Sequence, residues 1–188
     1  MPLPRFDRLP GPTRDHILAV ARAHFAQDGV ETASYNKIIL AAGISKTSAY
    51  HYFDGKHDLY DAVLADVAAR VGSVLGDWAP APDADAFWSA LASAGADLLE
   101  HLAAHPHDRA LLAASPEVEA GSWVRAMVED AVRLRLVRSD EHELMVALTG
   151  AVLGALDRYA LARPDLTAEV AARVPQLLAR LWTPHGGS

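Results

Sequence analysis

The sequence predicts an all-α protein of about nine helices. Apolar residues recur at helical spacing along most of the 188 residues. No alternating run of β-branched residues is bounded by turns, and no Asn-Gly or Asp-Gly pair joins two such runs into a hairpin. Hydrophobic residues make up 51% of the chain and charged residues 22%, a balance that supports a sizeable core and argues against disorder.

The N-terminal end is expected to form an arm and a first helix. Residues 1–12 include four prolines and one glycine, so a flexible arm is expected there. Thr13 is suited to cap the first helix, and Gly29 is suited to end it. Apolar residues spaced four apart predict the buried stripe of this helix, namely Ile17, Ala21 and Phe25.

Two short helices and a longer one follow. Ser34 is the expected cap of the second helix, which ends near Gly43. Ser45 is the expected cap of the third helix, which runs to about Tyr52. The fourth helix is expected over residues 56–78, ending at Trp78.

Prolines divide the rest of the chain into further helices. Asp140 and Glu143 have the spacing of a capping box at the start of the eighth helix. The expected helices cover residues 85–105, 108–114, 117–137, 140–163 and 166–182.

Composition excludes several classes of protein. The absence of cysteine rules out disulfides, thiolate zinc sites, iron–sulfur clusters and cysteine nucleophiles. The sequence has no run of 18 apolar residues, so no membrane span is expected. The first residues also lack the apolar stretch of a secretory signal, and the cytoplasm is therefore the expected compartment. The net charge of −7 is uneven, because residues 1–58 carry seven basic and six acidic residues while residues 59–188 carry ten and 18. The N-terminal part is therefore the one better suited to approach a polyanion.

Residues 34–53 carry the strongest functional signal. Two short helices meet at a turn centred on Gly43, as a helix-turn-helix requires, and glycine adopts positive φ without penalty. The second helix would present hydroxyl, ammonium, phenol and imidazole groups, which contact phosphates and base edges when a recognition helix enters the major groove. Lys56 lies at the start of the next helix, where backbone N–H groups can hold a phosphate. A helical corner with a solvated polar face is the alternative. The residues expected at DNA are Ser45, Lys46, Thr47, Ser48, Tyr50, His51 and Lys56.

The first 60 residues resemble the TetR family of bacterial transcriptional regulators. The resemblance implies a homodimer of nine or ten helices, with a three-helix DNA-binding domain at residues 1–58. A long fourth helix would join it to a larger ligand-binding and dimerisation domain at residues 59–188. Two positions depart from the family pattern and bear on the operator sequence: Thr47 stands where glycine is common, and Asn36, which would meet DNA from the second helix, stands where arginine is common. The matching residues are Ile17, Ala21, Phe25, Gly29, 36–39, 42–46, 50–53, Lys56 and Leu59.

The last two helices carry more apolar surface than one internal stripe needs, which suggests an isologous four-helix dimer interface. Gly150 and Gly154 would permit a close helix–helix approach, although an internal core helix explains either helix alone. The resemblance favours the dimer. The expected interface residues are Leu148, Gly150, Val152, Leu156, Leu177 and Leu181, and the expected pocket residues are Trp78, Trp88, Leu102, Trp123 and Met127.

Metal and enzymatic sites are not expected. His101, His105 and His107 cluster near a helix end, with Asp108 close by in the sequence, and the i, i+4 pair has a spacing that can bind zinc or nickel. Pro106 ends the helix between the last two histidines, and the helix dipole favours histidine there without any metal, so metal binding is the minor alternative. No phosphate-binding loop, dinucleotide fingerprint, nucleophile elbow or zinc-protease motif is present. The chain is therefore expected to be no enzyme and to need no cofactor.

The expected function is sequence-specific transcriptional regulation. The expected partners are double-stranded operator DNA, a second copy of the chain, and an apolar or amphipathic small molecule that releases the protein from DNA; no membrane is expected. Repression is an implication of the resemblance alone. The alternative is a helical protein-interaction module with a non-functional helix-turn-helix. The effector, the operator and the regulated genes are not encoded in any pattern of the sequence.

Overall fold

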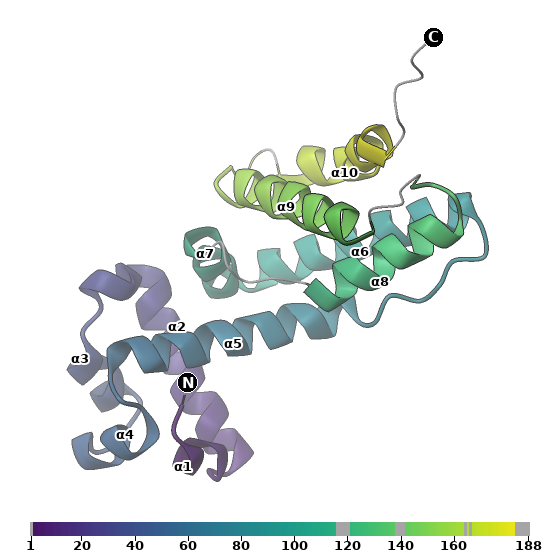
Figure 1. Ribbon diagram of the computed structural model, residues 1–188. Helices are drawn as coiled ribbons and strands as arrows, with labels where there is room; N and C mark the ends of the chain where they lie inside the picture. The colour runs from purple at the N-terminus through teal and green to yellow at the C-terminus, as the bar shows by residue number, and fades with distance from the viewer. Residues whose placement is uncertain (1, 116–120, 138–141, 164, 166, 183–188) are drawn as a thin grey trace. The chain divides into compact units, whose positions relative to one another are not determined.

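The computed structural model describes residues 2–115, 121–137, 142–163, 165 and 167–182. All regular structure in these ranges is helical, so the all-α prediction is confirmed (Figure 1). The helices are α1 Pro4–Asp7, α2 Gly11–Thr32, α3 Tyr35–Ala41, α4 Lys46–Tyr52, α5 Lys56–Leu75, α6 Ala84–Ala104, α7 Pro106–Ala114, α8 Gly121–Arg133, α9 His142–Leu161 and α10 Thr167–Trp182.

The chain forms two compact units. Unit 1 comprises residues 1–70 and 105–118, and unit 2 comprises residues 71–104 and 119–188. Helix α7 therefore packs with the N-terminal helices, although it follows α6 in the chain. The functional boundary expected at residue 58 stays a prediction, because packing into compact units does not define which residues bind DNA or ligand.

Unit 1 has an apolar core built on the predicted stripe of α2. Ile17, Ala21 and Phe25 are buried, as the spacing predicted. They pack with buried residues of α5 and with Leu111 of α7. The α5 residues in this core are Leu59, Ala62, Val63 and Val67.

The expectation of a flexible arm at residues 1–12 is wrong. Residues Pro4–Asp7 form α1, and Phe6 is only 3% exposed in the core of unit 1. The backbone N–H of Leu3 donates to the carbonyl of Tyr52 at 2.8 Å, so the segment is tied to the end of α4. The prolines suit this fold because the first turn of a helix tolerates proline. Burial of the large apolar side chain of Phe6 is enough to hold this segment against the core.

Two helix ends also differ from expectation. Helix α2 begins at Gly11, with Pro12 in its first turn, so Thr13 lies inside the helix and does not cap it. Helix α5 ends at Leu75, and Gly76 follows with a φ of 61°, a left-handed conformation that glycine adopts readily and that stops the helix before Trp78. Gly29, expected to end the first helix, has a φ of 72° and a non-helical conformation, and helical structure resumes after it up to Thr32.

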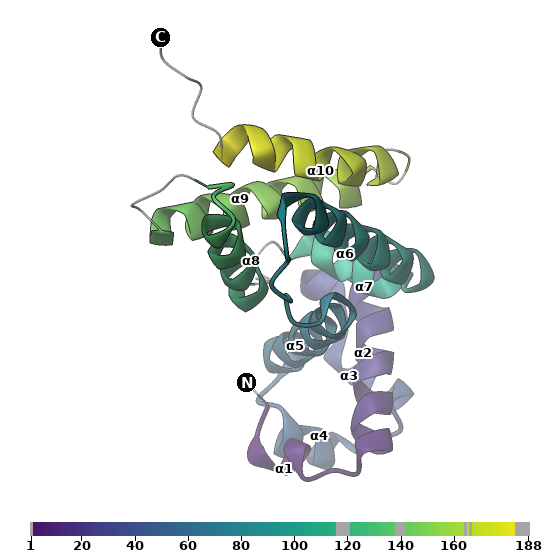
Figure 2. The same cartoon turned by 90° about the vertical axis from the view of Figure 1, so that its right-hand side faces the viewer.

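Unit 2 contains α6, α8, α9 and α10. Helix α10 packs on α6 and α9, and α8 packs on α9; Figure 2 shows α9 and α10 side by side. The largest fully buried side chains of this unit are Phe87, Met127, Val128 and Leu178. The capping box expected at Asp140 and the helix start expected at residue 117 lie outside the described residues.

Candidate nucleic-acid interface

Helices α3 and α4 form a helix-turn-helix whose ends are fixed by local hydrogen bonds. The hydroxyl of Ser34 accepts the Lys37 backbone N–H at 3.5 Å, and the hydroxyl of Ser45 accepts the Ser48 backbone N–H at 3.0 Å, so both predicted caps are confirmed. Gly43 has a φ of 68°, which confirms the reason for glycine in the turn.

The turn itself closes with a Schellman pattern. The Gly43 N–H donates to the Leu40 carbonyl at 3.0 Å, and the Ile44 N–H donates to the Ile39 carbonyl at 3.1 Å. These bonds satisfy carbonyl groups at the end of α3 and set the direction in which the chain enters α4.

Helix α4 has a buried face and a polar face. Ala49 is fully buried and anchors the helix to the core. Ser48 is half-buried, and its hydroxyl lies 2.9 Å from that of Ser45. These two side chains therefore stabilise the start of α4. The other expected DNA residues of α4 are exposed, and so is Asn36 on α3. The exposed set is Asn36, Ser45, Lys46, Thr47, Tyr50 and His51.

Lys56 has a structural partner that the sequence did not indicate. Its ammonium donates to the backbone carbonyl of Glu31 at 2.7 Å, near the end of α2. The Asp58 carboxylate accepts the Asp54 backbone N–H at 3.1 Å, just before α5. The start of α5 is therefore already engaged by groups of the chain, and Lys56 has ammonium donors left for a phosphate because lysine carries three.

Tyr50 is held by a second tyrosine. The rings of Tyr35 and Tyr50 lie 5.8 Å apart at 56°, and Tyr50 is 50% exposed. Burial, followed by the neighbouring Tyr50 and Asp58, raises the pKa of Tyr35 to about 12. The buried hydroxyl of Tyr35 has no hydrogen-bond partner among the described residues.

Comparison with known proteins agrees with this geometry. The family described as "Bacterial regulatory proteins, tetR family" matches residues 17–63, a range that contains the whole helix-turn-helix. The HTH-type transcriptional regulator AcrR of Shigella flexneri is 36% identical over 62 residues, which are 33% of this chain and 29% of AcrR. Residues 17–63 of this chain therefore match the TetR family of regulators. The HTH-type transcriptional repressor AcnR of Corynebacterium glutamicum is 34% identical over 68 residues, 36% of each chain.

The remainder of the chain is matched by fold alone. The matches span only about a third of the curated relatives' length. The structure of SmeT, the repressor of the Stenotrophomonas maltophilia multidrug efflux pump SmeDEF, covers 92% of this chain and 91% of SmeT with a TM-score of 0.69 and 17% identity. The TM-score establishes a common fold, whereas 17% identity is too low to carry over a ligand or partner.

The expected pocket residues of unit 2 mostly pack against aromatic neighbours. The ring of Trp78 lies 5.0 Å from Phe87 and 5.2 Å from Trp123, and Trp88 lies 5.1 Å from Phe87. Met127 is fully buried in the same core, whereas Leu102 is buried outside it. These residues are brought together largely as expected, but as a packed cluster, so their role in ligand binding stays a prediction.

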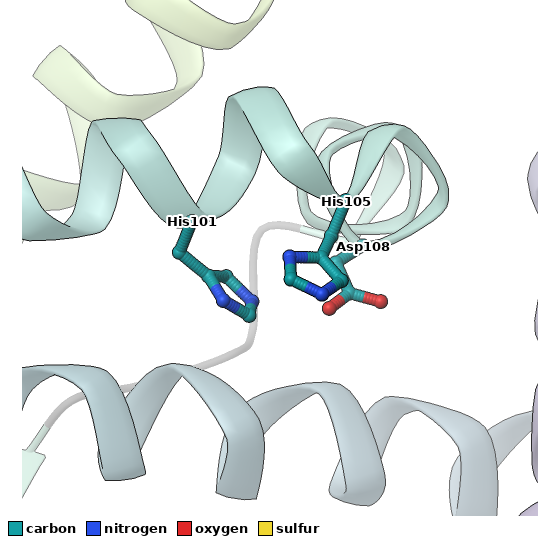
Figure 3. Close-up of side chains that lie close together, drawn as sticks. All are labelled: His101, His105 and Asp108. Carbon is teal, nitrogen blue, oxygen red and sulfur yellow. The ribbon is translucent and has the colours of Figure 1, made fainter.

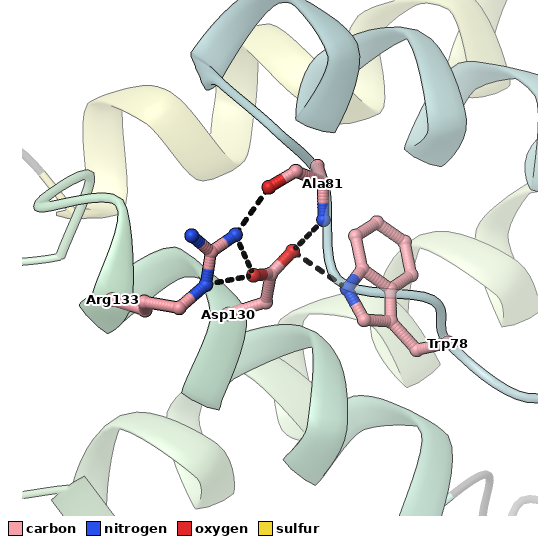
Figure 4. A network of polar contacts seen from close by, with 4 residues as sticks. All are labelled: Trp78, Ala81, Asp130 and Arg133. Atoms are coloured by element: carbon pink, nitrogen blue, oxygen red, sulfur yellow. Dashed lines mark hydrogen bonds and ion pairs between the residues drawn. The ribbon is translucent and has the colours of Figure 1, made fainter.

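Trp78 has a role that the sequence did not reveal, shown in Figure 4. One carboxylate oxygen of the buried Asp130 accepts the Trp78 indole N–H at 3.0 Å and the Ala81 backbone N–H at 2.8 Å. The other oxygen accepts two N–H groups of Arg133, at 2.9 and 2.6 Å, and Arg133 also donates to the Ala81 carbonyl. Burial alone would raise the pKa of Asp130, but these hydrogen bonds outweigh it and hold the pKa below its ordinary value.

An apolar groove lies elsewhere in unit 2, between α6 and α10. Its volume is about 250 Å³, somewhat below the usual range of drug-sized pockets. Pro175, inside α10, forms part of its wall. None of the expected pocket residues lines it; the lining residues are Ala92, Ala96, Leu99, Ala168, Ala171, Ala172 and Pro175.

The expected dimer residues divide into two groups. Leu148 is 41% exposed, Leu177 37% and Leu181 38%, so all three are available to a partner. Val152 packs against the core of unit 2, Leu156 is half-buried, and a Cβ added to Gly150 would lie 3.9 Å from Val124 of α8. Gly150 therefore faces a helix of its own protomer.

Proposed function

We propose that this chain is a dimeric transcriptional repressor that binds operator DNA through α4 and is released by a small molecule. The observation that carries DNA binding is the polar face of α4. Lys46, Thr47, Tyr50 and His51 are exposed together on a helix whose start, turn and buried face are all fixed. A recognition helix needs this combination, because its side chains must reach base edges while the backbone stays in register.

The proposal of a homodimer is supported by α9. This helix is long and apolar enough to cross a membrane by length and composition, and only 11% of its most apolar window is buried. Leu144, Leu148 and Tyr159 are exposed on it at helical spacing, beside Leu177 and Leu181 of α10. A second copy would cover this face, with α9 and α10 of each protomer forming a four-helix contact. Such a contact would remove the apolar surface of α9 from water.

The proposal of repression is supported by the names of two similar proteins, and the proposal of effector release is supported by the groove between α6 and α10. AcnR and SmeT are named as repressors, and SmeT as that of a multidrug efflux pump. The groove between α6 and α10 is lined by alanine, leucine and proline, so it would favour an apolar or amphipathic molecule smaller than most drugs. We place this regulator in the cytoplasm, without catalytic activity.

Selection of bound sequences from random DNA duplexes tests the proposal. A dimer should select two inverted half-sites about one helical turn apart, with affinity that falls steeply as salt rises. A protein-interaction module with a non-functional helix-turn-helix would select no sequence. A single half-site bound by a monomer would refute the dimer and leave DNA binding in place.

A further inference from the structure

Helix α1 is attached to the end of α4, the helix proposed to read DNA. The Leu3 backbone N–H donates at 2.8 Å to the carbonyl of Tyr52, the last residue of α4. The ring of Phe6 lies 4.7 Å from that of Phe53 and 6.3 Å from that of Tyr52. Figures 1 and 2 show α1 beside α4 from two directions. Because Phe6 is buried and the backbone is hydrogen-bonded, α1 has a fixed position relative to α4.

Two arginines of this segment are exposed. Arg5 lies within α1 and Arg8 directly follows it, and the pair is called the α1 arginines. Neither side chain has a hydrogen bond or an ion pair within the part of the chain that the structure describes. Residues 1–14 carry three arginines and one acidic residue, in a chain whose net charge is −7. This segment is therefore a local positive region, and it leaves two guanidinium groups available to an anion.

Two other arginines of unit 1 hold helices together. The carboxylate of Asp108 of α7, drawn in Figure 3, accepts from Arg22 of α2 at 3.1 Å and from Arg70 of α5 at 2.9 Å. Burial would raise the pKa of Asp108, but the hydrogen bond from Arg70 and the charge of Arg22 hold this pKa below its ordinary value. These ion pairs join α2 and α5 to α7, a role that the α1 arginines do not have among the described residues.

The width of the DNA groove determines what a segment beside α4 would meet. An α-helix with its side chains is about 10–12 Å across, and the major groove of B-DNA is about 12 Å wide. A recognition helix therefore fills the groove, and a segment packed beside it meets the sugar–phosphate backbone at the edge of the groove. His51 is exposed in the last turn of α4 and directly precedes Tyr52, to which α1 is hydrogen-bonded. The exposed polar face of α4 thus continues towards α1.

We propose that Arg5 and Arg8 bind backbone phosphates of operator DNA beside the groove that α4 enters. This inference rests on the proposed function and extends its interface to a helix outside residues 17–63, which the family model matches. Guanidinium groups suit this role, because they are always charged and can donate two parallel N–H groups to one phosphate. Phosphate contacts add affinity without reading sequence, and they set the position of the recognition helix on the duplex.

Arg5→Gln and Arg8→Gln test this interface in the full chain without an N-terminal tag. The probes are a mixed-sequence duplex and the duplex that the protein selects from random sequences. Each variant should bind both probes about three- to tenfold more weakly, and its salt slope should fall by about 1, because one phosphate contact is lost. The slope should fall by about 2 in the double variant. Arg5→Lys and Arg8→Lys should restore the slope, since lysine also neutralises one phosphate.

Arg135→Gln is the matched control. Arg135 is exposed in unit 2, and its side chain has no hydrogen bond or ion pair among the residues that the structure describes. The control removes the same charge as the other variants, and it should bind both duplexes like the parent. Ethylation of single phosphates locates the contacts directly. It should interfere with the parent just outside the bases that α4 reads, and this interference should be absent in the double variant.

Several results would overturn the role of α1. Glutamine variants could keep the affinity and salt slope of the parent while Lys46→Ala lowers the slope. Lysine variants could bind as weakly as the glutamine variants, which would indicate a structural effect, or Arg135→Gln could weaken binding equally. A change in the selected bases would also contradict the proposal, because phosphate contacts do not read sequence. In each case the parent still binds DNA and the proposed function stands, whereas a parent without salt-dependent DNA binding would refute both.

Discussion

At the level of single residues, the two lysines that flank α4 differ in their surroundings. Lys46 is exposed at the first position of α4, whereas the Lys56 ammonium donates to the Glu31 carbonyl. Lys46→Ala should weaken DNA binding on all sequences and lower the salt slope by about 1, because one phosphate contact is lost. Its thermal unfolding should not change, and Lys46→Arg should restore the slope.

Lys56→Ala should affect both binding and stability. Loss of its hydrogen bond to the Glu31 carbonyl should lower the free energy of unfolding by about 1 kcal/mol, in addition to a loss of about 1 in salt slope. Urea denaturation and DNA titration measure the two effects separately. A normal salt slope in both lysine variants would place this end of unit 1 away from DNA.

The unpaired hydroxyl of Tyr35 predicts that removing a polar group stabilises the protein. Because this buried group lacks a hydrogen-bond partner among the described residues, Tyr35→Phe should raise the free energy of unfolding by about 1 kcal/mol while it keeps the ring against Tyr50. Tyr60→Phe is the matched control, since the Tyr60 hydroxyl lies 2.6 Å from that of Ser115 and its loss should destabilise. Equal effects of the two changes in urea denaturation would contradict the assignment.

At the level of helices, the sequence predicts the local signals of the helix-turn-helix, whereas the cap at Thr13, the end of α5 and the contacts between distant residues differ from expectation. The caps Ser34 and Ser45 and the turn at Gly43 depend on neighbours within a few residues, so the sequence alone predicts them. The anchoring of Phe6 depends on residues nearly 50 positions away, and the hydrogen bond from Trp78 to Asp130 spans 52 positions. No spacing rule connects such residues, which is why Trp78 was assigned to a pocket.

The hydrogen bonds of Asp130 attach the segment between α5 and α6 to α8. Asp130→Asn should lower the free energy of unfolding by about 3 kcal/mol, because an amide cannot accept from Arg133, Trp78 and Ala81 together. Asp83→Asn is the control, since Asp83 accepts the Ala86 N–H at an exposed helix start, where asparagine serves equally well. Urea denaturation should show near-parent stability for this control.

The lowered pKa values of Asp108 and Asp130 also predict how stability depends on pH. A carboxylate whose native pKa is below its unfolded value stabilises the protein above the unfolded pKa, and this contribution is lost as pH falls below about 4 through the native pKa. Unfolding free energy should therefore drop more steeply with acid in the parent than in Asp130→Asn. Equal slopes between about pH 5 and 2 would show that Asp130 titrates normally.

Leu148 tests the apolar face of α9. Leu148→Glu should convert the proposed dimer to monomers, because it would bury a carboxylate at the proposed interface, and operator affinity should fall when two half-sites can no longer be bridged. Leu40→Glu is the matched control: Leu40 is 79% exposed on α3, so this variant should remain a dimer. Light scattering at micromolar concentration distinguishes the two, and a dimeric Leu148→Glu would move the interface elsewhere.

At the level of the whole molecule, α5 is shared by both units. Its residues up to Arg70 belong to unit 1, and those from Val71 belong to unit 2. One continuous helix therefore connects the helix-turn-helix with the part that contains the groove. A small change in its tilt would alter the separation of two recognition helices in a dimer, and a fixed half-site spacing makes binding sensitive to that separation.

Release by an effector then has a thermodynamic requirement. A ligand shifts DNA binding only if its affinities for the DNA-competent and DNA-incompetent states differ, and operator DNA must weaken the ligand by the same factor. All four tryptophans lie in unit 2, at positions 78, 88, 123 and 182, so indole fluorescence reports on that unit, whereas the helix-turn-helix proposed to bind DNA lies in the other. An apolar molecule that fills the groove should reduce operator affinity by about five- to 150-fold. No tryptophan lines the groove, so a change in fluorescence would report a rearrangement of the surrounding helices. The dissociation constant of such a molecule should rise by the same factor when operator is saturating. A molecule that quenches tryptophan while operator affinity stays constant binds both states equally and is not the effector.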